Sequence, residues 1–136
     1  MDRRIATRPQ RVLLVDDSDV VREMWTAWLT FWGFVVEEAR YAAEALEKAR
    51  TRRPDLIVMD LAVPVRHGRQ AIEVLASDPF TAAVPVLARS PQTYAVIPHA
   101  SKGAAGFQPR PADPGHLLRE IRDTLRARAR PSPGAA

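Results

Sequence analysis

The chain contains no cysteine, which excludes disulfide bonds and thiolate metal sites. Long hydrophobic runs are also missing. The longest aliphatic run near the N-terminus is Val12–Val15, too short for a signal-peptide core or a membrane span. Lysine is scarce and occurs only at Lys48 and Lys102. Together these absences favour a cytoplasmic protein, and we expect no membrane partner.

Arginine therefore supplies nearly all of the positive charge, and the formal net charge is +4. A basic chain invites comparison with nucleic-acid-binding proteins. However, the arginines gather at the two ends of the chain and around residues 50–53, with no aromatic residues interleaved. We interpret them as solvated faces and tails, and we do not expect a nucleic-acid partner.

Length and composition indicate one domain. The chain has 136 residues, of which 46% are hydrophobic and 26% charged, as in an ordinary soluble globule. We place the domain at residues 10–128, after a flexible N-terminal tail at residues 1–9. Residues 129–136 end in PSPGAA, and we expect them to form a disordered tail or a linker stub.

Short apolar runs alternate with helical patterns, which is typical of βαβ units around a parallel sheet. Strands are predicted over residues 12–15, 34–36, 56–59, 84–88 and 106–108. Helices are predicted between residues 18 and 33, over 41–50 and 70–75, and from residue 113 onward. Pro98 argues against a regular helix between residues 91 and 102, so we expect a short or irregular fourth helix there. The predicted fold is a doubly wound, five-stranded parallel α/β sheet.

The first predicted helix carries clear signals at both ends. Ser18 or Asp19 can cap its N-terminus, and Gly33 can end it. Its apolar residues follow the i, i+3, i+4, i+7 spacing of a helix face. We expect that face to pack on the core, with one tryptophan ring as the candidate for exposure: Val21, Met24, Trp25, Trp28, Leu29 and Trp32.

Carboxylates follow two of the predicted strands. The stretch VLLVDDSD places Asp16 and Asp17 after the first strand, and Asp60 ends the third. In doubly wound sheets, ligands bind beyond this edge of the strands. Clustered carboxylates repel one another unless a cation lies between them, and Mg²⁺ prefers such hard oxygen ligands. Helix capping explains one of these acids but not all three, so the sequence predicts a magnesium site. Ser90 and Arg110 follow the fourth and fifth strands at the same edge.

Several segments together resemble the receiver domain of two-component response regulators. They are VLLVDD (12–17), EEARYAAEAL (37–46), DLIVMDLAVP (55–64) with Gly68, VPVLARS (84–90) and GAAGFQPRPAD (103–113). The segments occur in the order and at the spacing of the family, over about residues 10–128. The resemblance implies the (βα)5 flavodoxin-like fold of a receiver domain.

The resemblance also implies roles for individual acids. Asp60 would be the phosphoacceptor, forming an aspartyl phosphate with a phosphoryl group from a sensor histidine kinase or a phosphotransfer protein. Asp16 and Asp17 would hold Mg²⁺, together with Asp60 and the backbone carbonyl of Ala62. The expected function is therefore signalling by phosphoryl transfer, and not an enzyme activity.

Two further residues match the family's switch positions. Ser90 would hydrogen-bond to a phosphate oxygen once Asp60 is modified. Phe107 lies where the family has an aromatic residue that moves with this hydroxyl, although plain core packing is the simpler explanation for Phe107 taken alone. Phosphorylation would then change binding to an output protein that the sequence does not identify, and the resemblance leaves a homodimer open.

The chain departs from the family at the basic residue before the proline that follows the fifth strand. The family has lysine there and this chain has Arg110. Arginine is a larger planar donor, which can bind a phosphate with two hydrogen bonds, pair permanently with Asp60 or point to solvent. Pro91 and Pro98 would also stiffen the segment that should move. The alternative hypothesis is therefore a pseudo-receiver, a protein-interaction module that acts without phosphorylation.

Two other classes fit less well. Phosphatases that form an aspartyl phosphate need a second aspartate two residues after the nucleophile, where this chain has Ala62. A dinucleotide-binding fold needs a glycine-rich loop after the first strand, where this chain has the sequence DDSD.

Overall fold

A computed structural model describes residues 8–60, 73, 75–89, 93–97, 108–109 and 114–129 of the chain. Its elements are β1 (Arg11–Val15), α1 (Asp19–Phe31), β2 (Val35–Ala39), α2 (Ala42–Arg52), β3 (Leu56–Asp60), β4 (Val86–Arg89), β5 (Thr93–Ile97), β6 (Gln108–Pro109) and α4 (Pro114–Ala129). Residues 73 and 75–77 are also helical. The predicted alternation of strands and helices is confirmed as far as β4.

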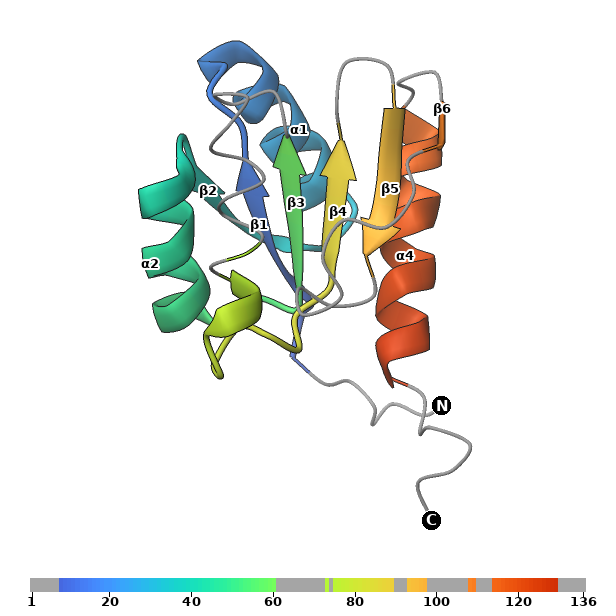
Figure 1. The fold of residues 1–136 in the computed structure, drawn as a ribbon. Coiled ribbons are helices and arrows are strands. Elements are labelled where there is room, and N and C mark those ends of the chain that lie inside the picture. Colours follow the sequence, from blue (N-terminus) through green and yellow to red (C-terminus); the bar gives the residue numbers. More distant parts are fainter. Residues whose placement is uncertain are drawn as a thin grey trace.

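The strands form one sheet in the order β2-β1-β3-β4-β5-β6. The pairs β1–β2, β1–β3 and β3–β4 are parallel. In this register Val15 of β1 lies opposite Ala39 of β2 and Met59 of β3. The carboxyl ends of these strands therefore lie together at one edge of the sheet (Figure 1).

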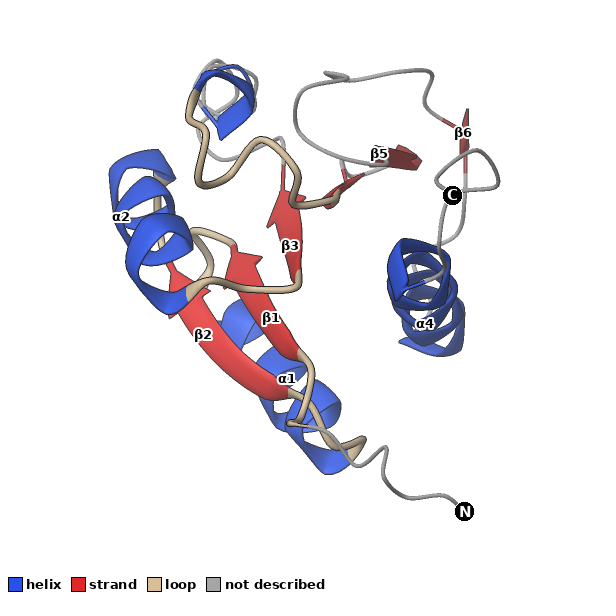
Figure 2. Ribbon diagram, turned by 90° about the horizontal axis from the view of Figure 1, so that it is seen from below, coloured by secondary structure: helices blue, strands red, loops and turns tan. Residues whose placement is uncertain are grey.

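Helices cover both faces of the sheet. α1 and α4 lie on one face and α2 on the other (Figure 2). Alternate residues of β1 and β3 enter the two cores, because successive side chains of a strand point to opposite faces. The core under α1 and α4 contains Val12, Leu14, Trp25, Leu29, Phe34, Leu56, Val58, Leu87, Leu117, Leu118, Ile121 and Leu125. The core under α2 contains Leu13, Val15, Ala39, Ala45, Ala49, Ile57, Met59, Leu75, Val84 and Val86.

The predicted end signals of α1 are confirmed. Ser18 has an extended backbone, and its Oγ accepts a hydrogen bond from the backbone N–H of Val21 at 3.2 Å. Gly33 follows the last turn with a φ of +97°, a conformation that glycine adopts without strain. Among the residues that the structure describes, no helix combines the length and the apolarity that a membrane crossing requires.

One prediction about α1 was wrong. Met24 was expected in the core, but 54% of its surface is exposed. Trp25 and Leu29 are buried as expected, and Trp32 is the exposed tryptophan, at 43%. The apolar residues of α1 extend around more than one face of the helix, and the face on the sheet is the one that also carries Arg22.

The region after β4 differs from the all-parallel prediction. Residues 93–97 form strand β5, antiparallel to β4, where we expected a short or irregular helix. The expected fifth parallel strand at 106–108 is replaced, within the described residues, by β6, which pairs antiparallel with β5. The sequence TYAVI contains residues that favour strands, and Pro98 ends the segment. Four parallel strands and two antiparallel ones therefore make up the described sheet.

Candidate functional site

The edge of the sheet brings two of the predicted acidic positions next to each other. Val15 and Met59 are register partners, so Asp16 and Asp60 directly follow them at the same level of neighbouring strands. Asp60 is the last residue of β3, and its backbone lies opposite Arg89 of β4. The backbone of the first and third strands thus has the arrangement that the sequence predicted.

Asp16 is buried at the edge of the sheet and held there by two hydrogen bonds. Only 2% of its surface is exposed, and its backbone N–H donates to the carbonyl of Ala39 at 3.0 Å. Its Oδ1 accepts a hydrogen bond from the backbone N–H of Ser18 at 2.9 Å. Asp17, by contrast, is exposed to solvent. The carboxylate of Asp16 is therefore fixed in the protein interior at the edge of the sheet, and the carboxylate of Asp17 lies on the protein surface.

Arg22 of α1 is buried and contacts the acidic loop, by which we mean residues 16–18 after strand β1. Its Nη1 donates to the backbone carbonyl of Asp16 at 2.8 Å. Its Nη2 contacts Oδ1 of Asp19 at 2.5 Å, and its Nε contacts Oε1 of Glu38 at 2.9 Å. One guanidinium thus joins the end of β1, the first turn of α1 and strand β2.

These contacts also change the ionisation of the groups. Burial of the Arg22 guanidinium opposes its charge, but the hydrogen bonds with Asp19 and Glu38 and the attraction of their negative charges together outweigh burial and raise the pKa of Arg22. The hydrogen bond from Arg22 and the attraction of its charge lower the pKa of the Asp19 carboxyl. Arg22 therefore keeps a permanent positive charge beside the acidic loop and offsets the repulsion among its carboxylates.

Sequence reasoning missed Arg22 and Glu38. A usable signal was present for Arg22, because it lies three residues before Trp25 and seven before Leu29, on the buried face of the helix. An arginine on a buried face requires acidic or carbonyl partners, since an unpaired buried charge is very costly. Glu38 could not be identified in this way, because strand β2 is only half-buried.

Most of the other predicted site residues lie outside the described residues. These are Ala62, Ser90, Phe107 and Arg110, and Asp60 is described by its backbone alone. Their roles stay predictions. Within the described ranges, no three histidine, aspartate or glutamate side chains gather closely enough to form a metal site.

The donors that the structure does place fit the predicted metal. Asp16 and Asp17 present carboxylate oxygens at the end of a buried strand, and Mg²⁺ typically takes one or two carboxylates together with water and phosphate oxygens. A fixed, buried carboxylate beside an exposed one suits an ion that keeps part of its water shell. Asp16 and Asp17 are thus the described residues that could hold Mg²⁺.

Comparison with known proteins gives a consistent result. The family model described as the response regulator receiver domain matches residues 12–122. The protein PilH of Pseudomonas aeruginosa is 32% identical over 117 residues, which cover 85% of this chain and 97% of PilH. The response regulator MprA of Mycolicibacterium vanbaalenii is 33% identical over 127 residues, which cover 93% of this chain and 54% of MprA. The chain therefore spans about half the length of MprA but nearly all of PilH.

Solved structures agree with this fold. The chemotaxis response regulator CheY4 of Vibrio cholerae is 28% identical and superimposes with a TM-score of 0.69, covering 86% of this chain and 99% of CheY4. A CheY-like receiver domain protein of Methanospirillum hungatei is 24% identical, with a TM-score of 0.73 over 89% of this chain and 97% of its own, and supports the fold alone. With its acidic edge, its sheet order and these matches, the chain belongs to the receiver domain family of two-component response regulators.

Proposed function

We propose that this receiver domain is a phosphorylation switch whose phosphoacceptor is Asp60. The observation that carries the proposal is the placement of buried Asp16 beside the end of β3, where Asp60 follows Met59. Asp17 adds a second, exposed carboxylate to the same edge. The proposed receiver unit is residues 10–128, and its proposed compartment is the cytoplasm.

In the proposed reaction, a carboxylate oxygen of Asp60 attacks the phosphorus of a phosphohistidine on a histidine kinase or a phosphotransfer protein. The O–P bond forms, the N–P bond breaks, and the imidazole leaves. Bound Mg²⁺ would neutralise the charge on the phosphoryl oxygens. Asp16 and Asp17 are the residues proposed to hold it, with Ala62 contributing its carbonyl.

Ser90 and Arg110 are proposed to bind the phosphate oxygens after transfer. Arg110 replaces the lysine of the family, and its planar guanidinium can donate two parallel hydrogen bonds to a phosphate. Movement of Ser90 would be accompanied by Phe107, which shifts the population of a second conformation that binds an output protein. The residues that motivated a phosphorylation-independent module, including Arg110 and Pro91, lie outside the described residues, so no structural observation favours that alternative.

The test is phosphoryl incorporation. The protein is incubated with acetyl phosphate and Mg²⁺, and intact mass is measured for an added phosphate that is stable in acid and labile in base. We expect wild type to gain this mass and Asp60→Asn to lack it. Asp17→Asn should reduce the incorporation, because it removes a carboxylate of the acidic edge. Asp123→Asn, an exposed acid on α4, should behave as wild type.

Absence of incorporation in wild type would contradict the switch as proposed. Arg110→Lys then locates the cause: recovery of incorporation would show that arginine at this position blocks the chemistry. Continued absence would assign the chain to the class of phosphorylation-independent interaction modules.

A further inference from the structure

The backbone of Asp16 is fixed on both sides by strand β2. Its N–H donates to the carbonyl of Ala39 at 3.0 Å. Its carbonyl accepts a hydrogen bond from Nη1 of Arg22 at 2.8 Å, and Nε of the same guanidinium donates to Oε1 of Glu38 at 2.9 Å. Glu38 and Ala39 are consecutive residues of β2. The two peptide groups that flank Asp16 are therefore tied to neighbouring positions of one strand, the first directly and the second through Arg22.

Strand β2 is itself held at this point by α2 and β1. Nζ of Lys48 donates to the carbonyl of Glu38 at 2.6 Å and pairs with Oε2 of Glu44, one turn earlier on α2, at 3.5 Å. On its other side, Glu38 is the register partner of Leu14 in β1. The backbone that carries the Glu38 carboxylate is thus fixed by two neighbouring elements, and Arg22 is anchored to a firm part of the sheet.

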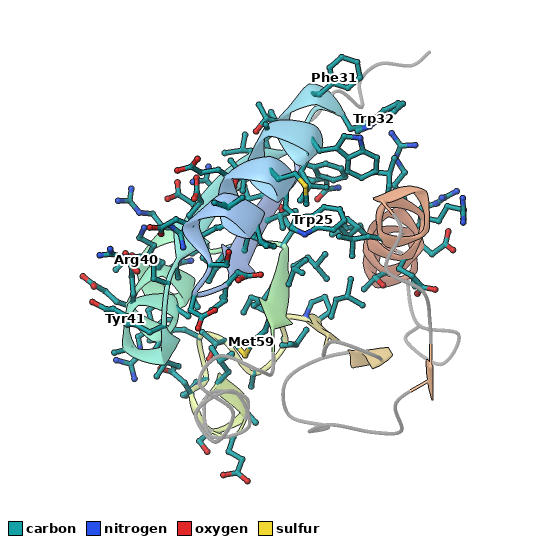
Figure 3. All side chains as sticks on the ribbon, turned by 90° about the horizontal axis from the view of Figure 1, so that it is seen from above. Trp25, Phe31, Trp32, Arg40, Tyr41 and Met59 are labelled. Carbon is teal, nitrogen blue, oxygen red and sulfur yellow. The ribbon has the colours of Figure 1, made fainter. Side chains whose placement is uncertain are left out.

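The helix that carries Arg22 is also packed firmly. Trp25 and Leu29, three and seven residues later, are 5% and 0% exposed and place the same face of α1 on the core. Trp25 packs edge to face on Trp28 with 6.0 Å between ring centroids, and Trp28 packs in the same way on Trp32 at 6.2 Å. Figure 3 shows Trp25 inside the molecule and Trp32 toward its periphery. The guanidinium of Arg22 therefore extends from a fixed backbone, and three acceptors in different directions fix its orientation.

We propose that Arg22 is a positioning residue for the Mg²⁺ site, which holds the acidic loop in its binding conformation before the ion arrives. The inference rests on the proposed function, in which Asp16 and Asp17 hold Mg²⁺. Ordering a loop costs free energy, so a loop that is already ordered binds its ligand more tightly. Removal of a polar group that orients metal ligands typically weakens metal binding by about 10–100-fold.

Charge alone predicts the opposite effect. The guanidinium repels Mg²⁺, and without Arg22 the carboxylates of Asp19 and Glu38 would remain and attract the ion. However, these two side chains are 66% and 36% exposed, so water and dissolved ions screen their charges. The hydrogen bond to the carbonyl of Asp16, by contrast, is buried. We therefore expect positioning to outweigh charge, so that the loss of this cation weakens the binding of another cation.

The first test is Mg²⁺ titration of the unphosphorylated protein at constant ionic strength, followed by the backbone amide signals of Asp17 and Ser18 in proton–nitrogen correlation spectra. We expect Arg22→Met to raise the dissociation constant for Mg²⁺ at least about tenfold. Arg22→Lys keeps the charge but not the three directed bonds, so its affinity should fall between those of Arg22→Met and wild type. Asp17→Asn should also weaken binding, which identifies the shifts with this site.

The matched control is Leu29→Val. Leu29 lies about two turns after Arg22 on the same buried face, so the change removes core packing without altering any bond of the acidic loop. This variant should be less stable than wild type, but once folded it should bind Mg²⁺ with the affinity of wild type. Circular dichroism at the temperature of the titration shows whether each variant is folded.

A second measurement needs no metal. The N–H of Ser18 donates to Oδ1 of Asp16 at 2.9 Å, so exchange of this amide proton with deuterated water reports how firmly the acidic loop is held. We expect the Ser18 amide to lose protection in Arg22→Met, relative to both wild type and Leu29→Val. Equal exchange in all three proteins would contradict the positioning role.

Two results of the titration would overturn the inference and leave the proposed function intact. If Arg22→Met binds Mg²⁺ as tightly as wild type, or more tightly, charge outweighs positioning. If Arg22→Met and Leu29→Val weaken binding equally, Arg22 acts only through the stability of the fold. A wild-type protein without Mg²⁺-dependent shifts is a different outcome, because it would contradict the magnesium site of the proposed function and this inference with it.

Discussion

Arg22 bonds to the end of β1, the first turn of α1 and strand β2, and these bonds hold the acidic loop in place. We expect Arg22→Met to lower the free energy of unfolding by about 2 kcal/mol, because the buried carbonyl of Asp16 loses its donor and two carboxylates lose their partner. The loss stays moderate since the side chains of Asp19 and Glu38 are 66% and 36% exposed and can be hydrated. Urea denaturation at neutral pH measures the effect.

The control is Arg119→Met, which makes the same chemical change at an exposed position of α4 and should alter stability by less than about 0.5 kcal/mol. Arg22→Lys should recover part of the loss, because an ammonium cannot reach three acceptors in the fixed directions of a guanidinium. Equal stability of Arg22→Met and wild type would mean that the ion pairs only compensate for their own desolvation.

Much of the candidate site could be predicted at the level of residues, and part of it could not. Asp16 and Asp60 were predictable because each directly follows an apolar run, and the ends of parallel strands meet at one edge. The burial of Asp16 beside exposed Asp17 was not predictable, since both carboxylates follow the same strand. It arises from the hydrogen bonds that Asp16 makes with Ala39 and Ser18.

At the level of elements, α1 depends on a single side chain at its start. The hydroxyl of Ser18 satisfies the N–H of Val21, one of the backbone groups that the first turn of a helix leaves without a partner. We expect Ser18→Ala to destabilise the protein by about 1 kcal/mol in thermal or chemical unfolding. Ser18→Asn, which keeps a capping oxygen, should stay close to wild type. Similar losses in both variants would show that Ser18 acts through something other than the cap.

The rotation of α1 was harder to predict than its ends. Its apolar residues cover so much of the helix circumference that periodicity alone gives two candidate inner faces. In the structure, the face with Trp25 and Leu29 packs on the core, and Met24 and Phe31 are exposed to solvent. Hydrophobic periodicity thus identified the helix but not its orientation on the sheet.

At the level of the whole molecule, two interior strands of the sheet were the most predictable. β1 and β3 are continuous apolar runs, as expected of parallel strands covered on both faces. The antiparallel strands after β4 were not predictable. Pro91 and Pro98 argue against a helix there, but they do not indicate which strand residues 93–97 would pair with. The pairing of residues 93–97 with β4 depends on tertiary contacts, which local strand propensity does not determine.

This topology can be tested directly in solution. The register pairs Leu87 with Val96 and Ala88 with Ala95. In an antiparallel pair, every second facing pair brings its Cα atoms to about 4.5 Å, close enough for a strong nuclear Overhauser effect between the two Cα protons. We expect such an effect for one of these two pairs in an isotope-labelled sample. A helix over residues 93–97 would give none, and would show sequential amide contacts instead.

The three tryptophan rings of α1 also have an optical consequence. Trp25 is buried, Trp28 is half-buried and Trp32 is at the surface, yet neighbouring rings are 6.0 and 6.2 Å apart. Indole rings at such separations can exchange excitation energy. Part of the light absorbed by the buried ring can therefore be emitted from the exposed one, and these are all the tryptophans of the chain. All tryptophan fluorescence of this protein thus arises from one helix, and we expect it to respond to changes around the exposed Trp32.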